Sequence, residues 1–261
     1  MRALLSICLT AAFTLPVTAA TKSKEVTYSH GGKMFKGHLY WDDAGPGKRP
    51  GVLVLHEWWG LDDYAKKRAE QLAGMGYVAF AADMYGEGKL AAHPDDAKKF
   101  AGEVRSNVEN WRGRARAALD VLAKDEHTDP SKLAAIGYCF GGSTALQLAY
   151  TGADLDAVVT FHAALPTPTA EQAKAVKAQV LVCHGADDKF VPEESVKKLK
   201  ETLDAASVKV RVEAYPGAVH SFTVPGADKH KLPGMAYNAE ADKKSWASMK
   251  AVFDEAFGAK K

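Results

Sequence analysis

The hydrophobic residues of this chain fall into short runs that alternate with longer segments of mixed polarity. Runs such as 52–56 (VLVLH) are apolar almost throughout, which is typical of strands buried on both faces of a sheet. Six strands are predicted after residue 51. They lie at 52–56, 77–83, 132–138, 156–163, 178–185 and 208–215.

The segments between these runs carry apolar residues at helical spacing. Residues 62–76 (DDYAKKRAEQLAGMG) show this clearly, and their closing glycines are a helix stop signal. The predicted helices are 62–76, 94–104, 110–125, 141–152, 171–177, 192–207 and 239–258. Because strands and helices alternate, the pattern predicts an α/β protein with a mostly parallel central sheet and helices on both faces.

The part of the chain before residue 52 has a different pattern. Residues 25–30 and 37–41 alternate like two strands of a hairpin, joined through a turn that contains glycines. This hairpin adds an antiparallel edge to the predicted sheet, and residues 44–51 are predicted to form a loop. Because the composition does not change along the chain, we expect one domain over residues 21–261.

The first twenty residues form a separate segment. Arg2 precedes an apolar run from Ala3 to Val17, and small residues follow, as in a secretory signal peptide. The run is shorter than the roughly 17–25 residues that span a bilayer, so a signal peptide over residues 1–20 is favoured over a membrane anchor. We expect cleavage near residue 19 or 20, and a periplasmic or secreted mature protein without a membrane anchor.

Composition and charge limit the possible partners. The chain has 261 residues, of which 47% are hydrophobic and 25% are charged, as in ordinary globular proteins. With 34 Lys and Arg against 32 Asp and Glu, it has no electrostatic footprint for nucleic acid or an anionic membrane surface. The sequence contains neither an H-E-x-x-H motif nor a phosphate or dinucleotide loop, so we expect no metal and no cofactor. Nothing in it fixes the oligomeric state.

A cysteine stands where a predicted strand turns into a predicted helix. Residues 137–141 (GYCFG) have the form G-x-C-x-G, with Cys139 at the centre. A serine at that position makes the nucleophile elbow, a sharp turn that exposes the side chain at the carboxyl edge of the sheet. The helix N-terminus behind the turn favours a thiolate. The motif predicts that Cys139 is a nucleophile, and a buried structural thiol is the alternative.

A nucleophile needs a base, and the base needs a group that orients it. On this kind of sheet the nucleophile is followed along the chain by an acid and then by a histidine. Asp188 follows the strand 178–185, and His220 follows the last predicted strand. Asp187 competes for the role of the acid, but the spacing to the next Val-Pro pair favours Asp188. The predicted triad is therefore Cys139, Asp188 and His220.

Other histidines and cysteines near the strand ends are assigned structural roles. His162 and His184 also end predicted strands, but neither follows the last one, so we expect hydrogen-bonded core histidines. In an oxidising compartment Cys183 could pair with Cys139. The strand 156–163 is expected to lie between the strands that carry the two cysteines. The distance between their Cα atoms then exceeds the roughly 7 Å that a disulfide allows. Both thiols are expected to be free.

Together these motifs resemble those of the dienelactone hydrolase family of the α/β-hydrolase fold. The matching segments are HEWWG (56–60), GYCFGG (137–142), GADDKFVP (185–192) and HSF (220–222). The similarity covers nearly all of the mature chain. It implies a carboxylic ester hydrolase that cleaves esters or lactones through a Cys-His-Asp triad and a thioester acyl-enzyme.

The resemblance also implies roles for residues around the triad. Glu57 matches a glutamate that pairs with the resting cysteine in that family and would tune the thiol. Its alternative is an ordinary surface carboxylate, but its place between a strand end and two tryptophans favours a pocket position. The oxyanion hole maps onto the backbone N–H groups of Trp58 and Phe140, an assignment that the elbow rule also supports.

The chain departs from the family in the expected substrate pocket. Family members that act on dienelactone bind the substrate carboxylate with two arginines, and the matching positions here are Glu87 and Val224. Because Glu87 would repel a carboxylate, we expect a neutral or cationic ester or lactone as substrate. Trp59 and Tyr85 complete the predicted substrate pocket.

Two other functions are compatible with the same motifs. The scaffold could belong to a non-catalytic binding protein. In that case the protein would not turn over an activated ester. An acyl-peptide or amide hydrolase would keep the catalytic groups and cleave another bond. Against the latter, the compact chain offers no obvious cap or propeller domain.

Overall fold

The computed structural model describes residues 21–43 and 47–258, so the predicted signal peptide lies outside the described residues. Within them the strands are β1 (Thr21–His30), β2 (Lys33–Asp42), β3 (Arg49–Leu55), β4 (Val78–Ala82), β5 (Thr128–Tyr138), β6 (Ala157–Phe161), β7 (Gln179–Gly185) and β8 (Val210–Tyr215). The helices are α1 (Asp63–Ala73), α2 (Pro94–Arg105), α3 (Val108–Lys124), α4 (Phe140–Ala149), α5 (Ala170–Ala175), α6 (Glu193–Ala205), the 3₁₀ helix η1 (Ala227–His230) and α7 (Ala239–Gly258). Among these described helices, none is both long and apolar enough to cross a bilayer.

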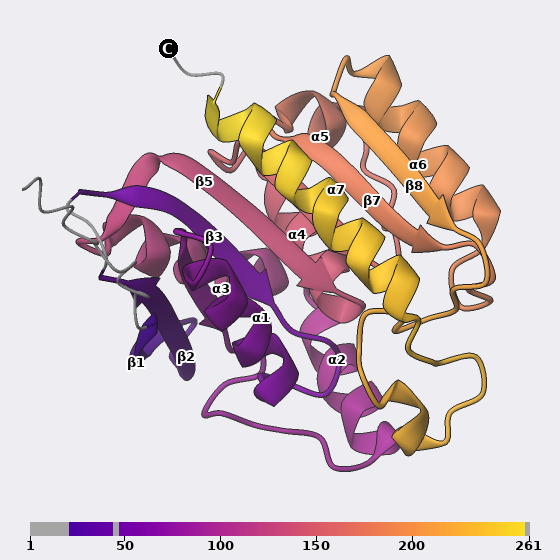
Figure 1. Ribbon diagram of the computed structural model, residues 1–261, viewed down its shortest axis with the longest axis horizontal. Coiled ribbons are helices and arrows are strands. Elements are labelled where there is room, and N and C mark those ends of the chain that lie inside the picture. Colours follow the sequence, from indigo (N-terminus) through magenta and orange to yellow (C-terminus); the bar gives the residue numbers. More distant parts are fainter. Residues whose placement is uncertain (1–20, 44–46, 259–261) are drawn as a thin grey trace, which may run out of the picture.

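The strands of the described residues form an eight-stranded sheet in the order β1-β2-β4-β3-β5-β6-β7-β8 (Figure 1). β2 pairs antiparallel with both β1 and β4, and the neighbouring strands from β4 to β8 are parallel. The predicted mostly parallel sheet with an antiparallel N-terminal hairpin is confirmed. Because β6 lies between β5 and β7, Cys139 and Cys183 stay apart, and both are free thiols as expected.

Alternate side chains along the central strands point to opposite faces of the sheet and belong to two apolar layers. In β3, Val52 and Val54 pack with α1 and α7, whereas Leu53 and Leu55 face the layer formed with α2 to α6. Figure 1 shows α1 and α7 on the near side of the sheet, with α7 lying in front of it between β5 and β7 and running roughly along the strands. Both faces are therefore covered, which explains why the central strands are apolar without alternation.

The structure differs from the sequence prediction mainly at the ends of elements. β3 begins at Arg49 and β5 at Thr128, and these two residues are partners across the sheet. The predicted loop 44–51 therefore ends inside a strand, because strand pairing is made by backbone groups whatever the side chains are. The helix η1 has no counterpart in the prediction. It lies in the long segment 216–238 between β8 and α7.

The turn from β5 into α4 holds Cys139 in an unusual backbone conformation. Cys139 has φ 49° and ψ −111°, which residues other than glycine rarely adopt. Two glycines allow the turn. A Cβ on Gly137 would lie 2.1 Å from the Gly141 carbonyl oxygen, and a Cβ on Gly141 would lie 2.1 Å from the Leu55 carbonyl oxygen. Helix α4 thus begins in direct contact with β3, at the carboxyl edge of the sheet.

Gly141→Ala should lower the free energy of unfolding by about 3 kcal/mol or more, because the added methyl group meets backbone atoms of Leu55 and His56. Urea denaturation of the purified variant measures this change. Gly102→Ala is the control, since nothing lies within 4 Å of a Cβ added at that position in α2. It should raise the free energy of unfolding by about 0.5–1 kcal/mol. Equal effects of the two substitutions would contradict the close-approach argument.

Candidate active site

The three predicted catalytic side chains meet at the carboxyl edge of the sheet. Cys139 follows β5, Asp188 follows β7, and His220 lies in the segment after β8. His220 Nδ1 is 2.8 Å from Asp188 Oδ2, and Cys139 and His220 line the same pocket. The competing Asp187 is exposed, whereas Asp188 is buried. The structure therefore brings together the residues that chain order selects.

Neighbouring backbone groups hold the acid and the base in place. Asp188 Oδ1 accepts a hydrogen bond from the backbone N–H of Phe190 at 2.9 Å, which leaves Oδ2 for His220. The backbone of His220 pairs with Gly234 and Ala236 on a neighbouring part of the same segment. Because Nδ1 of His220 donates to Asp188, Nε2 is the nitrogen that can serve the thiol.

The surroundings of His220 favour its protonated form. Burial alone would lower the pKa of this imidazole, but the nearby Cys139 and Asp188 outweigh burial and hold the pKa of His220 well above its usual value. The same groups stabilise the imidazolium that forms when the Cys139 proton moves to His220. The pair can therefore provide the thiolate–imidazolium state that a cysteine nucleophile requires.

Two backbone N–H groups next to the thiol are available to a substrate. They belong to Phe140, the first residue of α4, and to Trp58, in the loop after β3. Across residues 21–43 and 47–258, neither donates to a protein acceptor. The Trp58 carbonyl oxygen accepts from the Tyr85 hydroxyl at 2.8 Å, which fixes the loop. These N–H groups are suited to stabilise an oxyanion on a carbonyl attacked by Cys139.

His56 is a supporting residue that the sequence analysis missed. Its Nε2 accepts from the backbone N–H of Met84 at 3.1 Å, so its Nδ1 carries the proton and donates to the Glu57 carbonyl oxygen at 2.5 Å. The ring also packs against Tyr85 and Phe140, and burial lowers the pKa of His56. His56 belongs to the matched segment HEWWG, but nothing in the local pattern reveals its hydrogen bond to Met84, which follows β4.

Glu57 occupies an interior position beside the triad. It is 3% exposed, and burial raises the pKa of its carboxyl to about 7, against the opposing influence of His220 and Ser221. Ser221 Oγ donates to Glu57 Oε1 at 2.8 Å. This hydrogen bond goes to Ser221 and not to the Cys139 thiol, which differs from the pairing that the family resemblance implies. The thiol is associated with His220 instead.

Buried polar side chains continue from Glu57 into the protein. His162 Nδ1 lies 3.6 Å from Glu57 Oε1, and His162 Nε2 lies 2.7 Å from Thr223 Oγ1. Tyr64 donates to the same Thr223 oxygen, and Arg68 donates to Tyr64. Because Arg68 can only donate, we infer that each hydroxyl donates to the next group and that Thr223 donates to His162 Nε2. His162, the expected core histidine, then carries its proton on Nδ1 and faces Glu57.

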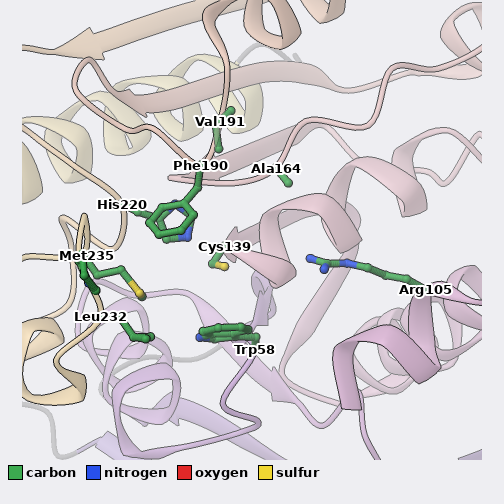
Figure 2. A pocket seen from close by; sticks show the side chains of 10 residues that line it. Trp58, Arg105, Cys139, Ala164, Phe190, Val191, His220, Leu232 and Met235 are labelled. Carbon is green, nitrogen blue, oxygen red and sulfur yellow. The ribbon is translucent and has the colours of Figure 1, made fainter. Parts of the chain in front are cut away.

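Cys139 opens into an apolar pocket of about 400 Å³ (Figure 2). The lining residues are Trp58, Arg105, Cys139, Ala164, Phe190, Val191, His220, Leu232, Pro233 and Met235. Figure 2 shows Arg105 reaching toward Cys139 from the side opposite His220. Such a pocket suits a small, largely apolar molecule that carries a few polar groups. Within the described residues, no cluster of three or more His, Cys, Asp or Glu side chains could hold a metal ion.

The four residues predicted to form the substrate pocket are not among those that line it. Trp59 is buried and stacks on His230, with 3.9 Å between the ring centroids. Tyr85 is also buried and supports the loop after β3. Glu87 is exposed in a left-handed turn (φ 58°) that is hydrogen-bonded to β2, and Val224 lies half-buried in a turn. This part of the prediction is corrected, because sequence position does not reveal which way these turns face.

The comparison with known families agrees with the geometry of this site. A profile of the dienelactone hydrolase family matches residues 35–257, a range that contains all the site residues described above. The chain belongs to the dienelactone hydrolase family. Among curated proteins, protein usf of Aquifex pyrophilus is 35% identical over 178 residues, which cover 66% of this chain and 76% of that protein.

Solved structures show the same relationship. The structure named m3DLH is 43% identical and superposes with a TM-score of 0.88, covering 91% of this chain and 99% of that one. P91, a dienelactone hydrolase-like promiscuous phosphotriesterase from metagenomic libraries, is 42% identical, with the same TM-score and coverage. The acylaminoacyl peptidase of Pyrococcus horikoshii, at 13% identity and a TM-score of 0.66, shares the fold over 90% of this chain and 41% of its own. The α/β-hydrolase fold is confirmed.

The raised pKa of Glu57 predicts a pH-dependent difference in stability between the wild type and Glu57→Gln. The folded carboxyl keeps its proton up to about pH 7, whereas the unfolded one loses it near 4.5, so folding becomes less favourable as the pH rises through this window. Relative to the variant, the wild type should lose about 3 kcal/mol of unfolding free energy between about pH 4 and about pH 8. Urea denaturation of both proteins measures this; a pH-independent difference would contradict a buried, titrating Glu57.

Proposed function

We propose that the protein hydrolyses carboxylic esters or lactones with Cys139 as its nucleophile. The observation that carries this proposal is the turn that presents Cys139 to an apolar pocket beside His220, whose imidazole is anchored by Asp188. A structural cysteine gains nothing from such a backbone conformation, which stores about 1–3 kcal/mol of strain. Membership of the dienelactone hydrolase family supports a hydrolase.

The first half of the proposed reaction forms a thioester. His220 takes the proton of the Cys139 thiol, and the sulfur attacks the carbonyl carbon of the ester. The N–H groups of Trp58 and Phe140 bind the oxygen that becomes negatively charged. When the tetrahedral intermediate collapses, the C–O bond breaks and His220 gives its proton to the leaving alcohol oxygen. The acyl group is then bonded to the sulfur.

The second half of the reaction releases the acid. His220, neutral again, takes a proton from a water molecule as the water oxygen attacks the thioester carbonyl. The same N–H groups bind the second oxyanion. When the C–S bond breaks, the sulfur leaves as a thiolate paired with the imidazolium of His220. Asp188 stabilises this imidazolium and keeps Nε2 directed at the reacting atoms.

Two rival functions remain to be separated by turnover measurements. A non-catalytic binding protein would be acylated by an activated ester without releasing the acid in repeated cycles. An amide or acyl-peptide hydrolase has no specific support here, because the likeness to acylaminoacyl peptidase is one of fold. Since P91 is named a promiscuous phosphotriesterase, a neutral phosphotriester belongs in the substrate panel beside esters and lactones.

Cys139→Ala should lower kcat/KM for p-nitrophenyl acetate by about 10³-fold or more, because it removes the covalent route and keeps the N–H donors. The measurement is initial rates together with a thermal melt, which should change little. The control is Cys183→Ala, which should keep the activity. Iodoacetamide should also label Cys139 faster, since burial raises the pKa of the Cys183 thiol well above its usual value. An inactive Cys183→Ala beside an active Cys139→Ala would overturn the assignment.

We further propose that residues 1–20 direct the chain out of the cytoplasm and are then removed. The basic Arg2, the apolar run and the small residues near position 19 support this proposal. Expression of the full chain in a bacterium should yield a periplasmic or secreted protein whose first residue is close to 20 or 21. N-terminal sequencing of the fractionated protein tests it, and an intact Met1 in the cytoplasmic fraction would contradict it.

A further inference from the structure

Arg105 is a cation without a carboxylate partner at the wall of the substrate pocket. It is the last residue of α2 and lines the pocket beside Cys139. In the described part of the chain, no Asp or Glu forms an ion pair with Arg105, and its guanidinium makes no hydrogen bond to the protein. The guanidinium lies over the Phe140 ring, with 5.3 Å between the guanidinium carbon and the ring centroid. An unpaired guanidinium with five donors is suited to bind a carboxylate in a bidentate manner.

The Phe140 ring is a rigid platform for this guanidinium. Phe140 is fully buried, and its ring packs with those of His56 and Trp111, with centroid distances of 5.9 Å and 5.7 Å. A cation that lies over such a ring is attracted to its face. The backbone N–H of the same residue is the proposed oxyanion donor. The guanidinium therefore lies over the side chain of the same residue whose N–H is proposed to bind the oxyanion.

The position of Arg105 relative to His220 determines which part of an ester it can reach. The leaving oxygen must lie within reach of His220, because that residue supplies its proton. In Figure 2, Arg105 and His220 lie on opposite sides of Cys139. The alcohol portion of an ester would therefore extend toward His220, and the acyl portion would extend toward Arg105.

A second hollow of about 350 Å³ continues the pocket beyond Arg105. It shares Arg105, Ala164, Phe190 and Val191 with the first pocket. Its other lining residues include two serines, Ser143 and Ser195. Arg105 thus lies at the junction of an apolar pocket around the thiol and a more polar hollow. An acyl chain that extends from the apolar pocket into the second hollow would pass the Arg105 guanidinium where the two meet.

We propose that Arg105 selects esters whose acyl portion ends in a carboxylate, namely monoesters of dicarboxylic acids. This inference rests on the proposed ester hydrolysis and names its substrate class. It also replaces the sequence-based expectation of a neutral or cationic substrate, because the positive charge comes from α2 and not from the two positions where the family places its arginines. Glu87, the residue expected to repel a carboxylate, does not line the pocket.

The test compares p-nitrophenyl hydrogen adipate with p-nitrophenyl hexanoate, which has the same acyl length and no charge. The measured quantity is the ratio of kcat/KM for the anionic ester to kcat/KM for the neutral ester. Arg105→Met should lower this ratio by about tenfold or more, mainly through a higher KM for the anionic ester. Arg105→Lys should give an intermediate ratio, because an ammonium keeps the charge and loses the bidentate geometry.

Lys99→Met is the matched control. Lys99 is exposed on the same helix and does not line the pocket, so its loss changes the net charge by the same amount. The ratio for this variant should equal that of the wild type. A ratio that is the same in the wild type and in Arg105→Met would overturn the proposal. An equal fall in Lys99→Met and Arg105→Met would also overturn it, since the effect would then be one of net charge.

Failure of the hydrolase proposal can be recognised separately. If the wild type turns over neither ester, the proposed reaction is wrong, and the role of Arg105 is then decided by binding. Monomethyl adipate would be titrated calorimetrically into Cys139→Ala and into Cys139→Ala combined with Arg105→Met. Binding that weakens about tenfold in the double variant supports anion recognition by Arg105. Equal binding by the two proteins, or binding by neither, overturns it.

Discussion

The close approach of helix α4 to strand β3 at Gly141 is the constraint on which the site depends. With no Cβ at this position, the helix begins against the Leu55 carbonyl group, and Cys139, the residue before the helix, adopts φ 49°. The backbone N–H of Cys139 is meanwhile bonded to the Phe161 carbonyl oxygen of β6 at 3.0 Å. The strained residue is thus held by the strands on both sides of β5. The thiol and the first N–H of α4 are positioned by the sheet itself, and their geometry does not depend on a mobile loop.

Burial and neighbouring charges decide which of the histidines near this thiol is protonated. His220 gains a raised pKa from Cys139 and Asp188, whereas burial, followed by the charge of His220, holds the pKa of His162 well below its usual value. The two imidazoles lie 5.4 Å apart, so both could not be charged without strong repulsion. The positive charge is therefore confined to the histidine that faces the thiol. Glu57, whose pKa is raised to about 7, adds a proton-binding group close to this pair.

The fold and the convergence of Cys139, Asp188 and His220 were predictable because they follow from local signals and one rule of topology. Carboxyl ends of parallel strands share an edge, so residues that follow β5, β7 and β8 converge although they are far apart in the chain. The pocket was not predictable in this way. Arg105 comes from the end of α2 and is directed by its packing on Phe140, which no periodicity reveals. The role of His56 likewise depends on a bond to Met84 beyond the neighbouring strand.

The segment between β8 and α7 contributes both His220 and part of the pocket wall. It carries His220, and its residues 232–235 form one wall of the pocket. The backbone of His220 is bonded to Gly234 and Ala236, so a change that moves this wall also moves the base. Arg105 lies outside this segment, on α2, and is bonded to neither the base nor the acid. In the proposed reaction, residues on α2 can therefore change which acyl group fits without moving His220, whereas changes in the 216–238 segment that move the pocket wall also move His220.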